Sequence, residues 1–247
     1  MNITTEGGLA PGTEGPSPRM AGEAFLSALQ FSDSFFPTGL YTLSHGFEAF
    51  VQAGLASKSD VEALLRDYLE NVLGPADGVA LTHAHRAVEA QDLARLLEID
   101  RRLSALKLVR EAREASRRVG KRILTTAIAL VPERLLADYR AAVEAGAGPG
   151  NAAVALGSAA AALRIPRREA LLIELYTFAT SLLGAAMRLV RLDHEEAQVI
   201  LGRVKPLMLR VAEENTDRSP SEMRAFAPLI DIMAMGHERA SVRLFIS

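Results

Sequence analysis

The most constraining feature of this sequence is its density of helix-forming apolar residues, with 41 alanines and 35 leucines among 247 residues. Alanine and leucine are the two strongest apolar helix formers. Aromatic residues account for only 5% of the chain, tryptophan is absent, and runs of β-branched residues are scarce. This composition disfavours a β-sandwich or barrel. Because this length fits about one domain, we expect an all-α, single-domain bundle of about ten helices.

Composition also excludes several classes of chemistry. The chain has no cysteine, so disulfides, zinc–thiolate sites, iron–sulfur clusters and cysteine nucleophiles are ruled out. Its 28 Lys and Arg residues nearly balance 30 Asp and Glu residues, and a domain that binds nucleic acid over its whole surface is usually strongly basic. Residues 1–22 are rich in Gly and Pro and lack the pattern of a signal peptide. We expect a disordered leader at 1–22, followed by the helical domain at 23–247.

Capping and breaking residues predict where the helices begin and end. A first helix is expected at 23–31, and a second from Ser44 to Ala53. Ser59 and Glu62 have the spacing of a capping box, and we expect the helix that they begin to end at Gly74-Pro75. Further helices are expected at 77–90, 92–104, 106–130, 132–145, 151–163, 167–192, 195–205 and 207–214, and a last one from a capping box at 219–222.

One stretch is long and apolar enough to raise the question of a membrane. Residues 170–187 carry a single charge, Glu174, and about 20 apolar residues span a bilayer. A carboxylate in hydrocarbon is costly, whereas an amphipathic helical domain offers such a helix a buried place at its centre. We therefore predict the central helix of the bundle, and no membrane.

Motifs for nucleotide or hydrolytic chemistry are missing from the sequence. Gly120-Lys121 lacks the preceding Gly and the following Ser or Thr of a phosphate-binding loop, and neither G-x-S-x-G nor H-E-x-x-H occurs. Any GTP or ATP chemistry must therefore come from another chain.

His83 and His85, with Glu89, suggest an alternative: a helical metal-binding protein or enzyme that uses these side chains as ligands. Residues two apart on a helix point to different sides. Two partly exposed polar residues are therefore the preferred interpretation of the pair.

A basic stretch runs from 101 to 122, with nine basic and two acidic residues. Arg110, Arg113, Arg117 and Lys121 share one helix face. A solvated face is the preferred interpretation and an acidic protein partner the next. Nucleic acid is disfavoured, because no aromatic residues are interleaved for stacking on single strands.

The C-terminus is unusually apolar, because the chain ends in Leu244, Phe245 and Ile246 before Ser247. Such an ending either packs on its own fold or forms an interface element that becomes ordered on binding. Composition does not separate these two possibilities.

Three segments together resemble a known family, the UreF urease accessory proteins. The first is 29–39 with Tyr41 and 44–48, the second is 110–116 with Gly120, and the third is 231–238 with the ending 243–247. Their order and spacing match the family over about 25–247, which is essentially the whole chain apart from the leader.

The resemblance implies an all-α cytoplasmic homodimer without catalysis of its own. In this family the protein binds the D-type (also called H-type) urease accessory protein, and together they recruit the G-type GTPase. The assembly then delivers nickel to apo-urease in a GTP-dependent way. Nickel and GTP are thus expected on the partners, with no cofactor, no nucleic acid and no membrane bound by this chain.

The resemblance and the charge pattern together give a set of candidate partner-binding residues. The C-terminal segment, including the tail 241–247, carries the family's contact to the D-type protein. Ile246 stands where the family commonly has Arg, which removes one charge. The candidates are His237, Glu238, Arg243, Leu244, Phe245, Ser247, Tyr41, Ser44, Glu48, Arg110, Arg113, Arg117 and Lys121.

Overall fold

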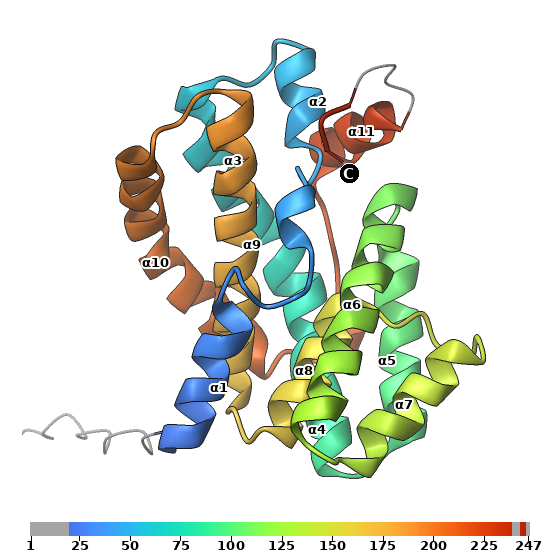
Figure 1. Cartoon of the computed structure of the whole chain (residues 1–247). Helices are drawn as coiled ribbons and strands as arrows, with labels where there is room; N and C mark the ends of the chain where they lie inside the picture. The colour runs from blue at the N-terminus through green and yellow to red at the C-terminus, as the bar shows by residue number, and fades with distance from the viewer. Residues whose placement is uncertain (1–19, 239–242, 246–247) are drawn as a thin grey trace, which may run out of the picture.

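The computed structural model describes residues 20–238 and 243–245, and all the regular structure within these ranges is helical. The predicted all-α, single-domain fold is therefore confirmed (Figure 1). Most of the predicted leader lies outside the described residues, although Gly22 already belongs to the first helix. The α-helices are α1 (Gly22–Ser32), α2 (Phe47–Gln52), α3 (Val61–Tyr68), α4 (Val79–Glu89), α5 (Leu93–Leu106), α6 (Arg110–Leu130), α7 (Arg134–Glu144), α8 (Ala152–Ala162), α9 (Arg167–Leu189), α10 (His194–Thr216) and α11 (Pro228–His237).

The centre of the bundle is built by α8 and α9. Helix α8 consists almost entirely of small residues, and α4 packs closely against it. A Cβ atom on Gly157 would lie 2.2 Å from the carbonyl oxygen of Leu81, so only glycine permits this approach. Helix α9 packs against α1, α4, α8 and α10 and runs through the middle of Figure 1. Among the described residues it is the helix whose length and composition would suit a membrane span, and here it lies inside the bundle, as the sequence predicts.

The predicted stop at Gly74-Pro75 is wrong, because α3 and α4 are joined by the π-helix η3 (Leu69–Gly78) into one continuous helix. Pro75 has no N–H, so the carbonyl of Asn71 lacks its α-helical donor. The amide of Phe226 donates to that carbonyl at 3.0 Å, and the amide of Arg224 donates to the carbonyl of Pro75 at 3.1 Å. The extended segment before α11 thus supplies hydrogen-bond donors to the carbonyls of Asn71 and Pro75.

Other predicted boundaries also shift. The predicted break before 207 is absent, because Pro206 and Gly202 lie on the exposed side of α10, where water can satisfy the carbonyl four residues earlier. The capping box before α3 pairs Ser57 with Asp60 rather than Ser59 with Glu62.

Three predicted helix starts are also displaced. The capping box at 219–222 forms, but it caps only the short 3-10 turn η4 (Pro220–Glu222). The last helix begins later, at Pro228. Helix α2 begins at Phe47 rather than Ser44, because His45 and Gly46 have φ angles of 54° and 81°. Residues 107–109 are not helical, so α6 begins at Arg110.

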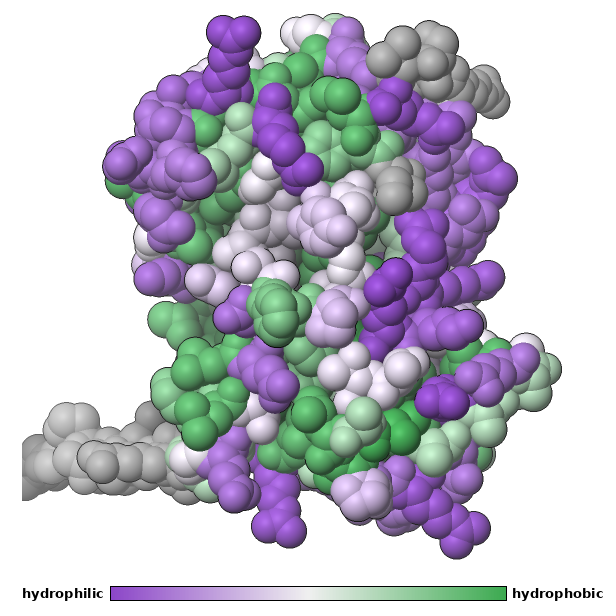
Figure 2. Space-filling model, in the orientation of Figure 1, coloured by the Kyte–Doolittle hydropathy of each residue, from purple (hydrophilic) through white to green (hydrophobic). Residues whose placement is uncertain are grey.

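The surface is strongly patterned. Figure 2 shows hydrophilic side chains gathered along α6 and hydrophobic surface over α1. On α1 the side chains of Phe25, Leu26 and Leu29 are exposed, because the helix buries mainly its opposite face against α9. The single chain therefore exposes a hydrophilic surface along α6 and an apolar surface on α1.

The loop between α7 and α8 is fixed by the buried carboxylate of Asp100 on α5. The hydroxyl of Tyr139 donates to it at 2.8 Å, and the amide of Gly150 at 2.7 Å. Asn151 donates to it through its amide at 3.0 Å and its side chain at 2.7 Å. One carboxylate thus connects α5, α7 and the start of α8.

We predict that Asp100→Ala lowers the free energy of unfolding by at least about 3 kcal/mol, because it leaves several buried donors without an acceptor. Urea unfolding followed by far-UV circular dichroism measures the change. Asp138→Ala is the matched control, because Asp138 only forms an exposed pair with Arg134 at 3.5 Å, and the change should stay within about 0.5 kcal/mol. Equal effects of the two substitutions would contradict the role assigned to Asp100.

Candidate functional site

The candidate site is a buried charge cluster where α2, α6, α11 and the C-terminal tail meet. The turn at His45 and Gly46 directs the start of α2 into the protein, so Glu48 is only 1% exposed. A Cβ atom on Gly46 would lie 3.1 Å from the Cβ atom of Ala234, which shows how closely α11 approaches this turn. Helix α11 also packs against α6. In Figure 1 the described part of the tail, 243–245, lies beside α2 and α11.

Glu48 is the acceptor at the centre of this cluster. Its Oε2 atom accepts from Nε2 of His237 at 3.0 Å and from the amide of Phe245 at 3.1 Å. Its Oε1 atom accepts from the amide of Leu244 at 2.8 Å and from Nε2 of Gln52 at 3.2 Å. Burial by itself raises the pKa of Glu48, but the donors from Leu244, His237 and Phe245 together hold it below its usual value. The carboxylate is therefore stable as an anion although it is buried.

Glu111 is the second carboxylate of the cluster. Its Oε2 atom lies 2.9 Å from Nδ1 of His237, and its Oε1 atom accepts from Nη1 of Arg243 at 2.6 Å. The His237 ring thus lies between two carboxylates that contact its two nitrogens. Because a carboxylate only accepts, both contacts are hydrogen bonds when the ring carries both protons. In that state His237 and Arg243 balance the charges of Glu48 and Glu111.

Two further contacts complete the attachment of the tail. Glu238 pairs with Arg110 at 3.3 Å, which connects the end of α11 to the start of α6. The ring of Phe245 is buried, and the guanidinium of Arg188 lies 4.4 Å from its centroid, within cation–π range. Arg188 also donates to the carbonyl of Tyr41 at 2.6 Å. The described part of the tail is therefore docked on the chain's own fold.

The structure brings most of the candidate residues together. Tyr41 contacts Arg188 only through its backbone carbonyl, and its side chain is exposed. Ser44 is buried next to the turn that leads into α2. Ser247 lies outside the described residues. The candidates that take part in the cluster through their side chains or amides are His237, Glu238, Arg243, Leu244, Phe245, Glu48 and Arg110.

The rest of the basic face lies apart from the cluster. Arg113 donates to the carbonyls of Lys107 at 2.6 Å and Leu108 at 2.7 Å, so it closes the loop between α5 and α6. Arg117 contacts the Ser104 hydroxyl at 3.5 Å, and Lys121 is exposed. A partner-binding role for these three residues stays a prediction.

Sequence reasoning missed Glu111 and Arg188 as members of the site. Glu111 is only one of the two acidic residues in the basic stretch, and Arg188 is not among the candidate residues. The available signal was the position of Glu111 inside the second segment that resembles the family. Its partners His237 and Arg243 lie 126 and 132 positions further along the chain, and spacing does not indicate such pairings.

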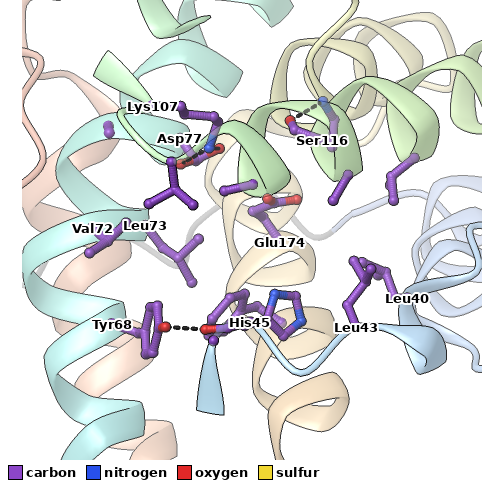
Figure 3. Close-up of a pocket in the computed structure, with 18 of the residues that line it drawn as sticks. Leu40, Leu43, His45, Tyr68, Val72, Leu73, Asp77, Lys107, Ser116 and Glu174 are labelled. Atoms are coloured by element: carbon purple, nitrogen blue, oxygen red, sulfur yellow. Dashed lines mark hydrogen bonds and ion pairs between the residues drawn. The ribbon is translucent and has the colours of Figure 1, made fainter. Parts of the chain in front are cut away.

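A pocket of about 190 Å³ lies beside the cluster, between the 36–46 loop, η3, the 107–109 loop, α6, α9 and α11. Its walls are mainly apolar, and Figure 3 shows some of the polar side chains that line it, among them His45, Lys107 and Glu174. Lys107 pairs with Asp77 at 2.7 Å. Nε2 of His45 lies 2.9 Å from the hydroxyl of Ser181, which donates to the carbonyl of Leu40 at 2.9 Å. Ser181 thereby accepts from the His45 ring.

Two side chains of the pocket have strongly displaced pKa values. Burial lowers the pKa of His45 to about 4, and the nearby charge of Lys107 acts in the same direction. Burial raises the pKa of Glu174 to about 7, helped by the charge of Asp77 and opposed by that of Lys107. His45 is therefore neutral at neutral pH, whereas Glu174 is about half ionised.

His83 and His85, the ligands of the alternative interpretation, contact different segments. His83 Nε2 lies 2.9 Å from the carbonyl of Arg218, and His85 Nε2 lies 2.8 Å from the carbonyl of Ile165. His85 is buried, so the prediction that it is partly exposed is wrong, and its ring is also 3.4 Å from Glu89. Within 20–238 and 243–245, no three His, Asp or Glu side chains gather as a metal site.

The fold and the cluster define an all-α protein whose C-terminal residues form part of its surface. The UreF family model matches residues 55–205, which is more than half of the chain. A relative named urease accessory protein UreF 2 from Brucella canis is 34% identical over 225 residues, covering 90% of this chain and 91% of the relative. Urease accessory protein UreF from Trichodesmium erythraeum is 32% identical over 221 residues, covering 89% of this chain and 95% of the relative. The chain belongs to the UreF family of urease accessory proteins, so the resemblance seen in the sequence is confirmed.

We predict that Glu48→Gln releases the tail while the bundle stays folded. The amide nitrogen of Gln faces hydrogen-bond donors, so at least one charged hydrogen bond worth about 1.5–3 kcal/mol is lost. Hydrogen exchange at the amides of Leu244 and Phe245 should accelerate at least about tenfold. Glu62→Gln, which alters surface ion pairs with Arg66 and Arg203, should leave this exchange unchanged. Unaltered protection in Glu48→Gln would mean that other contacts hold the tail.

Glu174 and His45 give stability opposite dependences on pH. Because the pKa of Glu174 rises from 4.5 to about 7 on folding, the folded state gains stability as the pH falls through this range. Because the pKa of His45 falls from 6.5 to about 4, the folded state loses stability as the pH falls from 6.5 to 4. Each effect is at most about 3 kcal/mol, so the two nearly cancel.

We predict that Glu174→Gln stabilises the chain at about pH 8 by up to about 3 kcal/mol and has little effect near pH 4.5. Removing the Glu174 contribution leaves that of His45, so the variant should lose stability steadily on acidification. Urea unfolding at the two pH values measures the difference. Parallel pH profiles of the variant and the unchanged chain would show that Glu174 titrates in its ordinary range.

Proposed function

We propose that this UreF-family chain is a non-catalytic adaptor in the nickel-dependent maturation of urease. In this role it binds the D/H-type accessory protein and the G-type GTPase and presents them to apo-urease. The partners carry the nickel and hydrolyse the GTP, and the chain itself needs no resident cofactor. We place the assembly in the cytoplasm with the chain as a homodimer, binding neither nucleic acid nor a membrane.

The observation that carries this proposal is the apolar surface beside the tail cluster. Phe226, Leu229, Ile232 and Leu244 are exposed by 57 to 75%. Leu229 and Ile232 are three residues apart on α11, so they share its outer face, while Ile230 and His237 on the same helix are buried. Exposed apolar patches with a polar rim are typical of protein–protein interfaces.

The charged residues around this surface supply the rim. Arg110, Glu238 and Arg243 lie at the edge of the cluster and are at least partly exposed. Because the same contacts also fix the tail, a partner that covers α11 would contact a preformed surface and avoid the entropic cost of ordering it. The second apolar surface, on α1, supports the homodimer part of the proposal, since it too is uncovered in the single chain.

The test is co-expression with the tagged D-type protein from the same organism, followed by size-exclusion chromatography with light scattering. The double variant Leu229→Asp with Ile232→Asp should weaken the complex at least about tenfold, because it places charges in an apolar interface. Val199→Asp is the matched control, since Val199 is a half-exposed apolar residue on α10. Deletion of 242–247 should also weaken the complex.

The outcomes separate the role from the place of binding. If the full-length folded chain forms no complex, the adaptor proposal is wrong. If the complex tolerates both the double variant and the deletion, the adaptor role stands but the assigned surface is wrong.

A further inference from the structure

Glu174 is a partly buried carboxyl group that has no partner among the described residues. It lies on the long, largely apolar helix α9 and points into the pocket, as Figure 3 shows. Among the described residues no side chain or amide forms a hydrogen bond or ion pair with this carboxyl. Buried carboxyl groups are normally paired or hydrogen-bonded, because an unpaired charge is costly in apolar surroundings.

The neighbouring charges do not supply the missing cation. Lys107 forms two hydrogen bonds with Asp77, at 2.7 and 2.9 Å, so these two side chains neutralise each other. His45 contacts Ser181 and has the lowered pKa described above, so it is neutral at neutral pH. Asp231 also lines the pocket and, like Glu174, forms no hydrogen bond or ion pair with a described side chain, so the pocket contains more acids than its bases can balance.

The size and the walls of the pocket limit which cation fits. Its volume is about 190 Å³, and an apolar cavity of about 150 Å³ holds a benzene-sized molecule. Leu43, Val72 and Leu73 are among the apolar side chains that line it. No three His, Asp or Glu side chains of the described residues are placed to coordinate a metal ion there. A monovalent cation with an apolar stem can pair its charge with the Glu174 carboxylate and pack its stem against the apolar side chains of the walls.

The pocket is also reachable from outside. Leu108 lines it and is 61% exposed, and this residue belongs to the loop between α5 and α6. A ligand can therefore enter beside this loop without opening the core of the bundle.

We propose that the pocket binds a primary alkylammonium group with a stem of about four to six carbons. The ammonium donates to the Glu174 carboxylate, and the stem packs against the apolar walls. A free aliphatic amine and the lysine side chain of a partner protein share this chemistry. The inference does not depend on the adaptor role, because the single chain contains the whole pocket.

The test is calorimetric titration of the full-length chain with n-pentylamine and with n-pentanol at about pH 8, where Glu174 is ionised. The amine should bind at least about tenfold more tightly than the alcohol, because only the amine forms a charged hydrogen bond. Glu174→Gln should remove this preference. Glu169→Gln is the matched control on the same helix, outside the pocket lining, and it should retain the preference.

A second variant tests the location. Thr177 lines the pocket one turn after Glu174, and Thr177→Leu should weaken both ligands by filling the cavity. Equal binding of amine and alcohol, an amine affinity unchanged in Glu174→Gln, or no binding of either ligand would overturn the proposal.

A last arm separates the two sources of the ammonium group. The amine titration is repeated on the purified complex with the D-type protein. Loss of amine binding in the complex identifies a partner lysine as the occupant, whereas retained binding identifies a free amine. Both results require the alkylammonium site that we propose.

Discussion

The buried carboxylate of Glu48 is the interaction on which the functional end of this protein depends. It accepts from His237 on α11 and from two amides of the tail, so one side chain near the start of the chain fixes its last described residues. Burying a charge is costly unless donors surround it, and here Gln52 supplies a fourth. Glu111 extends the network to α6 through His237 and Arg243. The surface next to α11 is consequently set by long-range hydrogen bonds as well as by apolar packing.

The path of the chain toward α11 depends on a second constraint, the proline in η3. Because Pro75 donates no hydrogen bond, the carbonyl of Asn71 is open to the amide of Phe226. Together with the contact between Arg224 and the carbonyl of Pro75, this directs the segment before α11 along η3. The same π-helix carries Asp77, whose pairing with Lys107 leaves Glu174 without a cation in the pocket. The extended segment before α11 and the pocket therefore both depend on η3.

Much of the fold was predictable from the sequence, whereas the contacts of the site were not. Alanine and leucine density predicted the helices, and the single charge in 170–187 correctly indicated a central buried helix. The rules that treat proline as a helix stop failed at Pro75 and Pro206, because an extended segment and exposure to solvent compensate for the missing N–H in each case. The motifs indicated His237 and Glu48 individually. Their mutual contact spans 189 positions, and only the packing of α11 against α2 brings them together.

The most direct test of this account is a distance measurement across the docked tail. Because the chain has no cysteine, spin labels can be attached specifically at Arg118→Cys on α6 and Leu244→Cys in the tail, both exposed positions. Pulsed electron paramagnetic resonance on the isolated chain should give one narrow distance distribution, because the Glu48 network fixes the tail without a partner. A broad distribution that narrows only when the D-type protein is added would contradict the account.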